Sequence, residues 1–302
     1  MLQYLLLVCI ILAQSSQDFF IKRFNQVEPN HSNFDTNLRF TAISSGVEFI
    51  VLVVVWLFAS DEEFFHLPTI GFAAVFGVCF VGATLFTLLA VAEGSLALSS
   101  LLISYSLLIP TAWSIFFNHG DQYKNPLFII GITLLCVSIF FIREEDKSDK
   151  AERKITKKWV FYVVGAIVSN GICNIVRDMH QHYYPEQYRS PFLAISMVYV
   201  EIVCLIIMLV RRKERVKYEP KPLVFCSSMN GTVNAIANLL VMTVVGAGVI
   251  PEAIMYPVMS AGQFVFLFII AFIIFKERFS KLQYVGYFLG ALSVVILNLK
   301  IT

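Results

Sequence analysis

Long apolar blocks, separated by short polar connections, run along the whole chain. Each block has about 18 to 26 residues, the length at which an α-helix crosses a hydrocarbon layer of about 30 Å. Their apolar positions are not spaced as the half-buried stripe of a soluble helix. The pattern predicts ten membrane-spanning helices, at residues 2–21, 37–59, 67–92, 95–117, 126–142, 158–177, 191–210, 222–247, 250–275 and 281–299.

A charged segment at residues 143–157 divides these blocks into five and five, in residues 1–142 and 158–302. The two parts resemble each other at a shift of about 155 residues, because the segments 40–48 (FTAISSGVE) and 192–201 (FLAISMVYVE) share A-I-S and a later glutamate. An odd number of helices makes the second part enter the membrane from the opposite face. We therefore expect an all-α integral membrane protein built from two inverted five-helix repeats, an arrangement typical of secondary transporters.

Composition agrees with this interpretation, since 58% of the residues are hydrophobic and only 15% are charged, against about 25% in soluble domains. The net charge of +2 does not favour nucleic acid as a partner. The six cysteines fall in or beside apolar blocks and are expected to be small buried side chains. No metal site or cofactor is expected, and the absence of phosphate-loop and hydrolase motifs argues against an enzyme.

The distribution of Lys and Arg indicates the orientation of the helices. Of the 23 basic residues, all but four fall in the connections after the first, third, fifth, seventh and ninth helices, the exceptions being Lys124, Arg177, Arg189 and Lys300. The basic face is expected to be cytoplasmic, so both termini are expected outside. No Lys or Arg is expected at the middle of the membrane, which disfavours carriers of nucleotide sugars or phosphates.

Segments 94–142 and 248–299 resemble the repeat of the drug/metabolite transporter superfamily, in its EamA-like branch. The likeness rests on the Glu277–Arg278 turn with Gln283 and Gly286, on the small residues after Glu93, and on Pro110, Arg39 and Phe40. The first half departs from the family pattern, with residues 118–122 (NHGDQ) in place of a Glu–Arg turn. The resemblance implies a secondary transporter in which helices 1–4 and 6–9 line a central cavity.

Two glutamates fall halfway along predicted helices, Glu48 in the second and Glu201 in the seventh. Glu48 shares a helical face with Thr41, Ser44 and Ser45. Charged groups at this depth are costly and usually face a cavity or a partner. We expect Glu48 and Glu201 to bind solute and to carry protons. The alternative is that a neighbouring hydroxyl or amide satisfies each carboxylate, which then only fixes helix packing.

Amides and hydroxyls recur at helical spacing on other predicted helices. Such groups must face protein or water rather than lipid, and they suit a zwitterionic or hydroxylated solute. Interhelical hydrogen bonding, worth about 0.6 kcal/mol per contact, is the alternative. The expected solute contacts, besides the two glutamates and Ser44, are Ser104, Asn230, Asn234, Asn238, Tyr256 and Gln263. Part of the polar run 14–18 is expected near the cytoplasmic mouth. A functional role for this run and a local pair of Asp18 with Lys22 are both left open.

The sequence thus predicts a proton-coupled secondary transporter in the cell (inner) membrane. Its expected cargo is a small polar or zwitterionic metabolite such as an amino acid, moved by alternating access. Two alternatives stay open: an exporter of lipophilic cations with the same fold, and a receptor or scaffold that transports nothing. Protons and membrane lipid are the other expected partners, and a homodimer is left open, as are the direction of transport and the coupling ion.

Overall fold

The computed structural model describes residues 2–28, 33–59, 62–93, 99, 103, 105–118, 126–142, 156–211, 219–273 and 280–298. These residues are almost entirely helical, and no strand occurs among them. The elements are α1 (Leu2–Val27), α2 (Phe34–Ala59), α3 (Leu67–Glu93), η1 (Tyr105–Leu107), α5 (Leu108–Trp113), η2 (Ser114–Asn118), α6 (Pro126–Ile142), α7 (Lys157–Tyr183), α8 (Arg189–Arg211), α9 (Pro220–Ala247), α10 (Glu252–Ile273) and α11 (Lys281–Asn298).

Six of the described helices, α1, α2, α3, α7, α8 and α9, are long and apolar enough to cross a membrane. A helix of 26 residues such as α2 is about 39 Å long at 1.5 Å per residue, which exceeds the hydrocarbon thickness. Many large apolar side chains point outward instead of inward, among them Leu5, Ile50, Phe58, Phe161, Ile206 and Phe288. The expectation of an all-α, multi-pass membrane protein is therefore confirmed.

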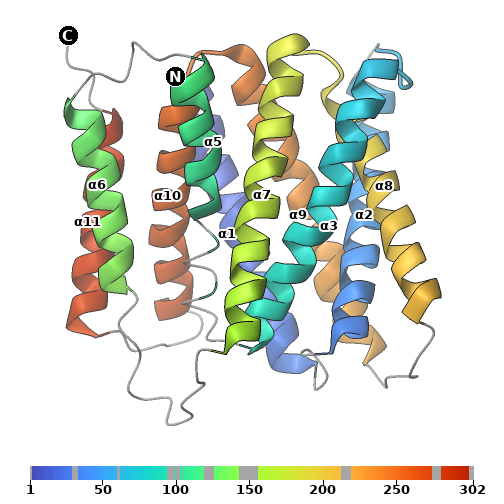
Figure 1. Ribbon diagram of the computed structural model, residues 1–302, viewed down its shortest axis with the longest axis horizontal. Coiled ribbons are helices and arrows are strands. Elements are labelled where there is room, and N and C mark those ends of the chain that lie inside the picture. Colours follow the sequence, from blue (N-terminus) through green and yellow to red (C-terminus); the bar gives the residue numbers. More distant parts are fainter. Residues whose placement is uncertain are drawn as a thin grey trace.

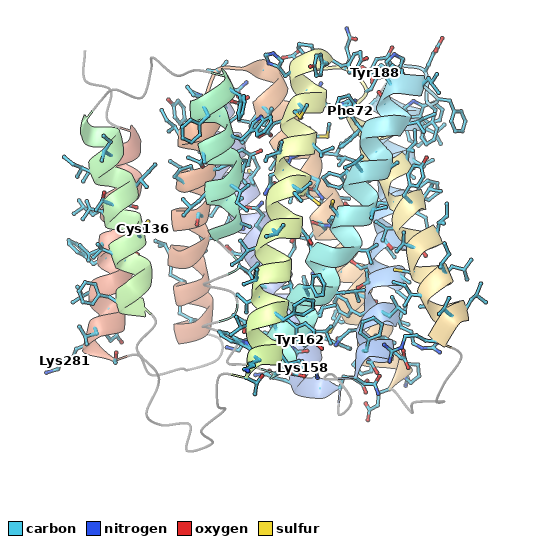
Figure 2. The ribbon with its side chains drawn as sticks, viewed as in Figure 1. Phe72, Cys136, Lys158, Tyr162, Tyr188 and Lys281 are labelled. Carbon is cyan, nitrogen blue, oxygen red and sulfur yellow. The ribbon has the colours of Figure 1, made fainter. Side chains whose placement is uncertain are left out.

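The helices run side by side along one direction, so the bundle has two ends (Figure 1). We call the end that holds Lys158 and Lys281 the basic end (Figure 2). Here the Lys158 ammonium pairs with Glu93, which joins the start of α7 to the end of α3. At the same end, Arg211 lies 3.6 Å from Asp35, which joins the end of α8 to the start of α2.

The opposite end, the hairpin end, holds Tyr188 and Phe72 (Figure 2). The backbone N–H of Tyr188 donates to Glu62 at 2.8 Å, joining the α7–α8 turn to the segment before α3. α1 begins and α11 ends at this end (Figure 1). Consequently α1, α3, α8 and α10 run toward the basic end, whereas α2, α7, α9 and α11 run away from it.

Helices from the two parts of the sequence pack on one another in crosswise pairs. α1 lies against α9 and α7 lies against α3, while α2 and α8 pack on each other at the edge of the bundle away from α6 and α11 (Figure 1). α2 also contacts α9, as α3 contacts α8. α6 and α11 pack together at one edge of the bundle, next to α10 (Figure 1).

Glycines permit the closest of these approaches. A Cβ on Gly231 of α9 would lie 2.1 Å from the carbonyl oxygen of Ser44 in α2. A Cβ on Gly77 of α3 would lie 2.6 Å from the carbonyl oxygen of Ser196 in α8. Association of helices in lipid relies on such small residues, because apolar burial provides little drive there.

Two helices extend six residues beyond the ends of the apolar blocks that predicted them. α1 was expected to end at residue 21 and α7 at residue 177, but they continue to Val27 and Tyr183. The additional turns of α7 are polar, yet Asp178, His180 and Gln181 are buried. Their side chains face neighbouring helices, so the helix continues where its hydropathy falls.

Candidate functional site

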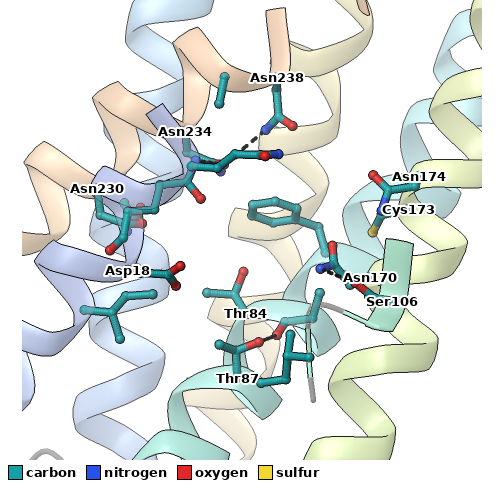
Figure 3. Close-up of a pocket in the computed structure, with 18 of the residues that line it drawn as sticks. Asp18, Thr84, Thr87, Ser106, Asn170, Cys173, Asn174, Asn230, Asn234 and Asn238 are labelled. Atoms are coloured by element: carbon teal, nitrogen blue, oxygen red, sulfur yellow. Dashed lines mark hydrogen bonds between the residues drawn. The ribbon is translucent and has the colours of Figure 1, made fainter. Parts of the chain in front are cut away.

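A cavity of about 190 Å³ lies inside the bundle, between α1, α2, α3, η1, α7, α9 and α10 (Figure 3). Most of its lining side chains are polar, although an outward-facing apolar surface surrounds the bundle. The polar lining consists of Gln14, Gln17, Asp18, Thr41, Ser44, Thr84, Thr87, Ser106, Asn170, Asn174, Arg177, Asn230, Asn234, Asn238 and Gln263. The arrangement can hold a small polar solute within the span of the helices.

The asparagine stripe of α9 forms one wall of this cavity. Asn230, Asn234 and Asn238 all line it, as the spacing of four residues predicted. Asn230 accepts a hydrogen bond from the Ser44 hydroxyl at 3.1 Å, and Asn234 accepts one from the Gln17 amide at 2.9 Å. The structure thus brings the stripe and Ser44 together at the cavity.

Glu48 lies directly behind this wall. Its side chain is fully buried, and its two carboxylate oxygens accept hydrogen bonds from Asn234 at 2.8 Å and from Asn238 at 3.1 Å. Glu48 is therefore one side chain away from the cavity and touches it only through these two amides. Both asparagines offer their other amide atoms to the cavity side of the network.

Glu201 occupies a different place. It accepts a hydrogen bond from Ser45 at 2.8 Å in the contact between α8 and α2, and it is not among the residues that line the cavity. The shared A-I-S segments, at 42–44 and 194–196, correspond at a shift of 152, whereas the two glutamates differ by 153. One residue turns a helix by about 100°, so Glu201 faces α2 where Glu48 faces α9.

Of the other expected contact residues, one lines the cavity, one does not, and one lies outside the described residues. Gln263 lines the cavity and donates to Gln14 at 2.7 Å. Tyr256 is fully buried but does not line the cavity, because its hydroxyl donates to Asp178. Ser104 lies outside the described residues.

Arg177 was expected at the end of the predicted helix 158–177, on the face opposite the basic one, and was not expected in the cavity. It lies in the sixth turn of α7, is 3% exposed and lines the cavity. Its Nη1 donates to Asn238 at 3.0 Å, and its Nη2 donates to Asn174. Both acceptors are neutral amides. The cavity therefore contains a cation, which weakens the argument against carriers of nucleotide sugars or phosphates.

Asp18, for which a functional role and a local pair with Lys22 were both open, lines the cavity, and no ion pair between it and Lys22 occurs among the described residues. Arg177 was missed because the end of its apolar block was interpreted as lying near a membrane surface. The spacing of polar residues contained a signal. Gln14, Gln17 and Asp18 share one face of α1, and the positions 156 residues later, on one face of α7, are Asn170, Cys173 and Asn174.

Apolar clusters lie on both sides of the cavity along the bundle. Toward the hairpin end, α1, α9 and α10 pack Ile10, Val241, Met255 and their neighbours into a buried cluster. Toward the basic end, Phe24, Phe40 and Leu88 form another, with ring centroids of the two phenylalanines 4.7 Å apart.

No protein-family model matches the sequence, and no curated protein matches it. Among solved structures, 28 chains match. One of them, a crystal structure, superposes on 98% of this chain and 96% of its own chain with a TM-score of 0.74, at 11% sequence identity. At that identity the likeness concerns the fold alone.

Proposed function

We propose that this chain is a secondary transporter of the drug/metabolite type, in the EamA-like branch, which moves a small zwitterionic or polar metabolite by alternating access. The observation that carries the proposal is the polar cavity at the centre of an apolar bundle, lined from both halves of the sequence. Polar side chains at this depth are costly unless a cavity or a partner satisfies them. A solute passage gives them that environment.

Two inverted repeats of five helices are part of the proposal, and the cavity lining supports them. The four lining residues of α1 correspond at a constant shift of 156 to the four of α7, namely Gln14, Gln17, Asp18 and Ile21 with Asn170, Cys173, Asn174 and Arg177. Four lining residues of α3 correspond at a shift of 154 to four of α9, namely Phe76, Phe80, Ala83 and Thr84 with Asn230, Asn234, Ala237 and Asn238.

Packing between the halves supports the same relation. Gly77 and Gly231 differ by 154 residues and touch the carbonyl oxygens of Ser196 and Ser44, the serines of the two A-I-S segments. The paired helices run in opposite directions along the bundle (Figure 1). In the proposal, the predicted block 95–117, of which η1, α5 and most of η2 are described, is the fourth spanning segment, and α6, α10 and α11 complete the ten.

Proton coupling is assigned to Glu48. Glu48 is a buried carboxyl group that can bind and release a proton, and it is joined to the solute-facing amides of Asn234 and Asn238. Protonation changes what these amides can donate to, which links the proton to the geometry of the cavity wall. Glu201 has no such connection, because Ser45 is its hydrogen-bond partner.

The proposal places the protein in the cell membrane with the basic end in the cytoplasm. Lys158 and Arg211 lie at that end, as the excess of basic residues in cytoplasmic connections requires. Both termini are then outside. An exporter of lipophilic cations is the rival function, and Arg177 disfavours it, since a cation in the cavity would be repelled by the guanidinium.

Transport in reconstituted vesicles tests the proposal. The purified protein is placed in sealed liposomes, and uptake of labelled amino acids, taken one at a time, is measured with and without a pH gradient. We expect at least one amino acid to be taken up faster than by protein-free vesicles, and its rate of uptake to rise when the pH gradient is imposed. Uptake of lipophilic cations alone supports the rival function, and no uptake of either class contradicts both.

A further inference from the structure

Asp18 presents an unpaired carboxylate to the cavity. It lies on α1 and lines the cavity, and Figure 3 shows it projecting inward between Asn230 and Thr84. Its side chain has no hydrogen-bond or ion-pair partner in the described part of the chain, whereas Gln14 and Gln17 on the same helix are both hydrogen-bonded. An uncompensated acid inside a membrane span is a binding-site hypothesis by default.

Arg177 presents an incompletely satisfied guanidinium to the same cavity. It is 3% exposed, its two Nη atoms donate to neutral amides, and its Nε has no hydrogen-bond partner. The carboxylate next to it in sequence, Asp178, accepts the Tyr256 hydroxyl, and both of these groups also interact with Arg177. Glu48 reaches Arg177 through Asn238, which accepts from Arg177 and donates to Glu48. The Nε–H is itself buried, so an anionic group in the cavity would meet Arg177 through the part of its guanidinium that lines the cavity.

The two charges lie at different levels of the bundle. Asn230 donates to the backbone oxygen of Gln17, so Asp18 lies near the Asn230 level of α9, whereas Arg177 contacts Asn238. The eight residues between Asn230 and Asn238 rise about 12 Å. The cavity is therefore negative toward the basic end and positive toward the hairpin end, with neutral amides between.

We propose that Asp18 and Arg177 are the two poles of a zwitterion site, with Asp18 binding the solute's cationic amino group and Arg177 its carboxylate. This assignment rests on the proposed function and specifies its solute. A cation alone leaves the cavity face of the guanidinium without an anionic partner, and an anion alone leaves Asp18 unpaired. Only a solute that carries both charges satisfies both residues, and the guanidinium binds carboxylates with directed N–H bonds.

Chemical removal of each charge tests the two poles separately. The common amino acids, β-alanine and γ-aminobutyrate are screened by thermal stabilisation of the purified full-length protein, since binding to the folded state raises the melting temperature. The best of them is then compared with its methyl ester, which keeps only the amine charge, and its N-acetyl derivative, which keeps only the carboxylate. We expect both derivatives to bind at least about tenfold more weakly, the loss of one charge-assisted hydrogen bond.

Variants then connect each charge to its residue. Asp18→Asn is expected to weaken the zwitterion about tenfold or more and leave the N-acetyl derivative within about twofold. Arg177→Gln is expected to weaken the zwitterion similarly and leave the methyl ester within about twofold. Glu201→Gln, away from the cavity, is the control and should change none of the three. A merely structural role for Asp18 or Arg177 would weaken all three ligands together.

The outcomes distinguish this inference from the proposed function. Selective losses in both variants support the two poles, even if no flux is measured and the transport proposal fails. A second outcome is that an amino acid is transported, but each variant weakens the zwitterion, the methyl ester and the N-acetyl derivative equally. That outcome overturns the two poles and leaves transport standing. Equal affinity of the zwitterion and its methyl ester in the unmodified protein overturns the role of Arg177 directly.

Discussion

Replacement of Gly231 by alanine perturbs the contact that sets the distance between α2 and α9. The added Cβ would lie 2.1 Å from the Ser44 carbonyl oxygen and 2.9 Å from its carbonyl carbon. Ordinary contact begins at 3.4 Å, so the two atoms must separate by about 1.3 Å. The neighbour is backbone rather than a flexible side chain, so no rotamer change relieves the overlap, and the helices must move apart.

Overpacking of this kind costs about 1–3 kcal/mol, and the absence of a local escape places Gly231→Ala at the upper end. At about 2 °C per kcal/mol for a large chain, the melting temperature is expected to fall by about 6 °C. Separation of α2 from α9 also lengthens the bonds of Glu48 to Asn234 and Asn238, so solute affinity is expected to fall with stability.

Thermal unfolding of the purified protein in detergent measures the effect. Gly71→Ala is the matched control, because a Cβ there meets nothing within 4 Å. That control is expected to be neutral or stabilised by about 0.5–1 kcal/mol, as alanine favours helix over glycine. If Gly231→Ala melts together with Gly71→Ala, the close approach of α2 and α9 described here is wrong.

Two further substitutions test the assignment of individual side chains. Glu48→Gln removes the only group proposed to carry protons, so uptake is expected to lose its dependence on the pH gradient while solute affinity stays within about threefold. Glu201→Gln is the control and should keep the dependence. Uptake by Glu48→Gln that still depends on the pH gradient contradicts the assignment. Tyr256→Phe leaves the buried Asp178 without its hydroxyl donor, which should destabilise the protein by about 1–3 kcal/mol. Because Tyr256 reaches the solute only through Arg177, solute affinity should fall less than in Asn234→Ala. Affinity that falls as much in Tyr256→Phe as in Asn234→Ala would place Tyr256 in the solute site.

Hydrophobic length was sufficient to predict where most helices lie. The predicted block 126–142 coincides with α6, and 222–247 agrees with α9 to within two residues. Such blocks are easy to recognise because lipid imposes one length and one polarity on whatever faces it. The same criterion failed for α7 beyond residue 177, because those residues face other helices and not lipid.

The amide stripe could also be predicted, since three asparagines at a spacing of four residues must share a face of any helix. What the sequence did not reveal was which partner each polar face would meet. Glu48 and Glu201 have similar positions along their helices, and a rotation by a single residue separates them. Arg177 was not recognised, and the role of Asp18 stayed open, because a charge near the end of an apolar block gives no indication of whether it faces headgroups or a cavity.

Accessibility of the cavity from both faces of the membrane tests the transport mechanism most directly. The six native cysteines are first replaced by serine, and a single cysteine is then introduced at one of two positions. Ser44→Cys places it in the cavity lining, and Ser196→Cys places it at the fully buried counterpart on α8. A membrane-impermeant thiol reagent is applied to sealed vesicles from either side, with and without a transported amino acid. Alternating access predicts that Ser44→Cys reacts from both sides, that solute slows the reaction, and that Ser196→Cys does not react. Reaction of Ser44→Cys from one side only, in a variant that still transports, would contradict the mechanism.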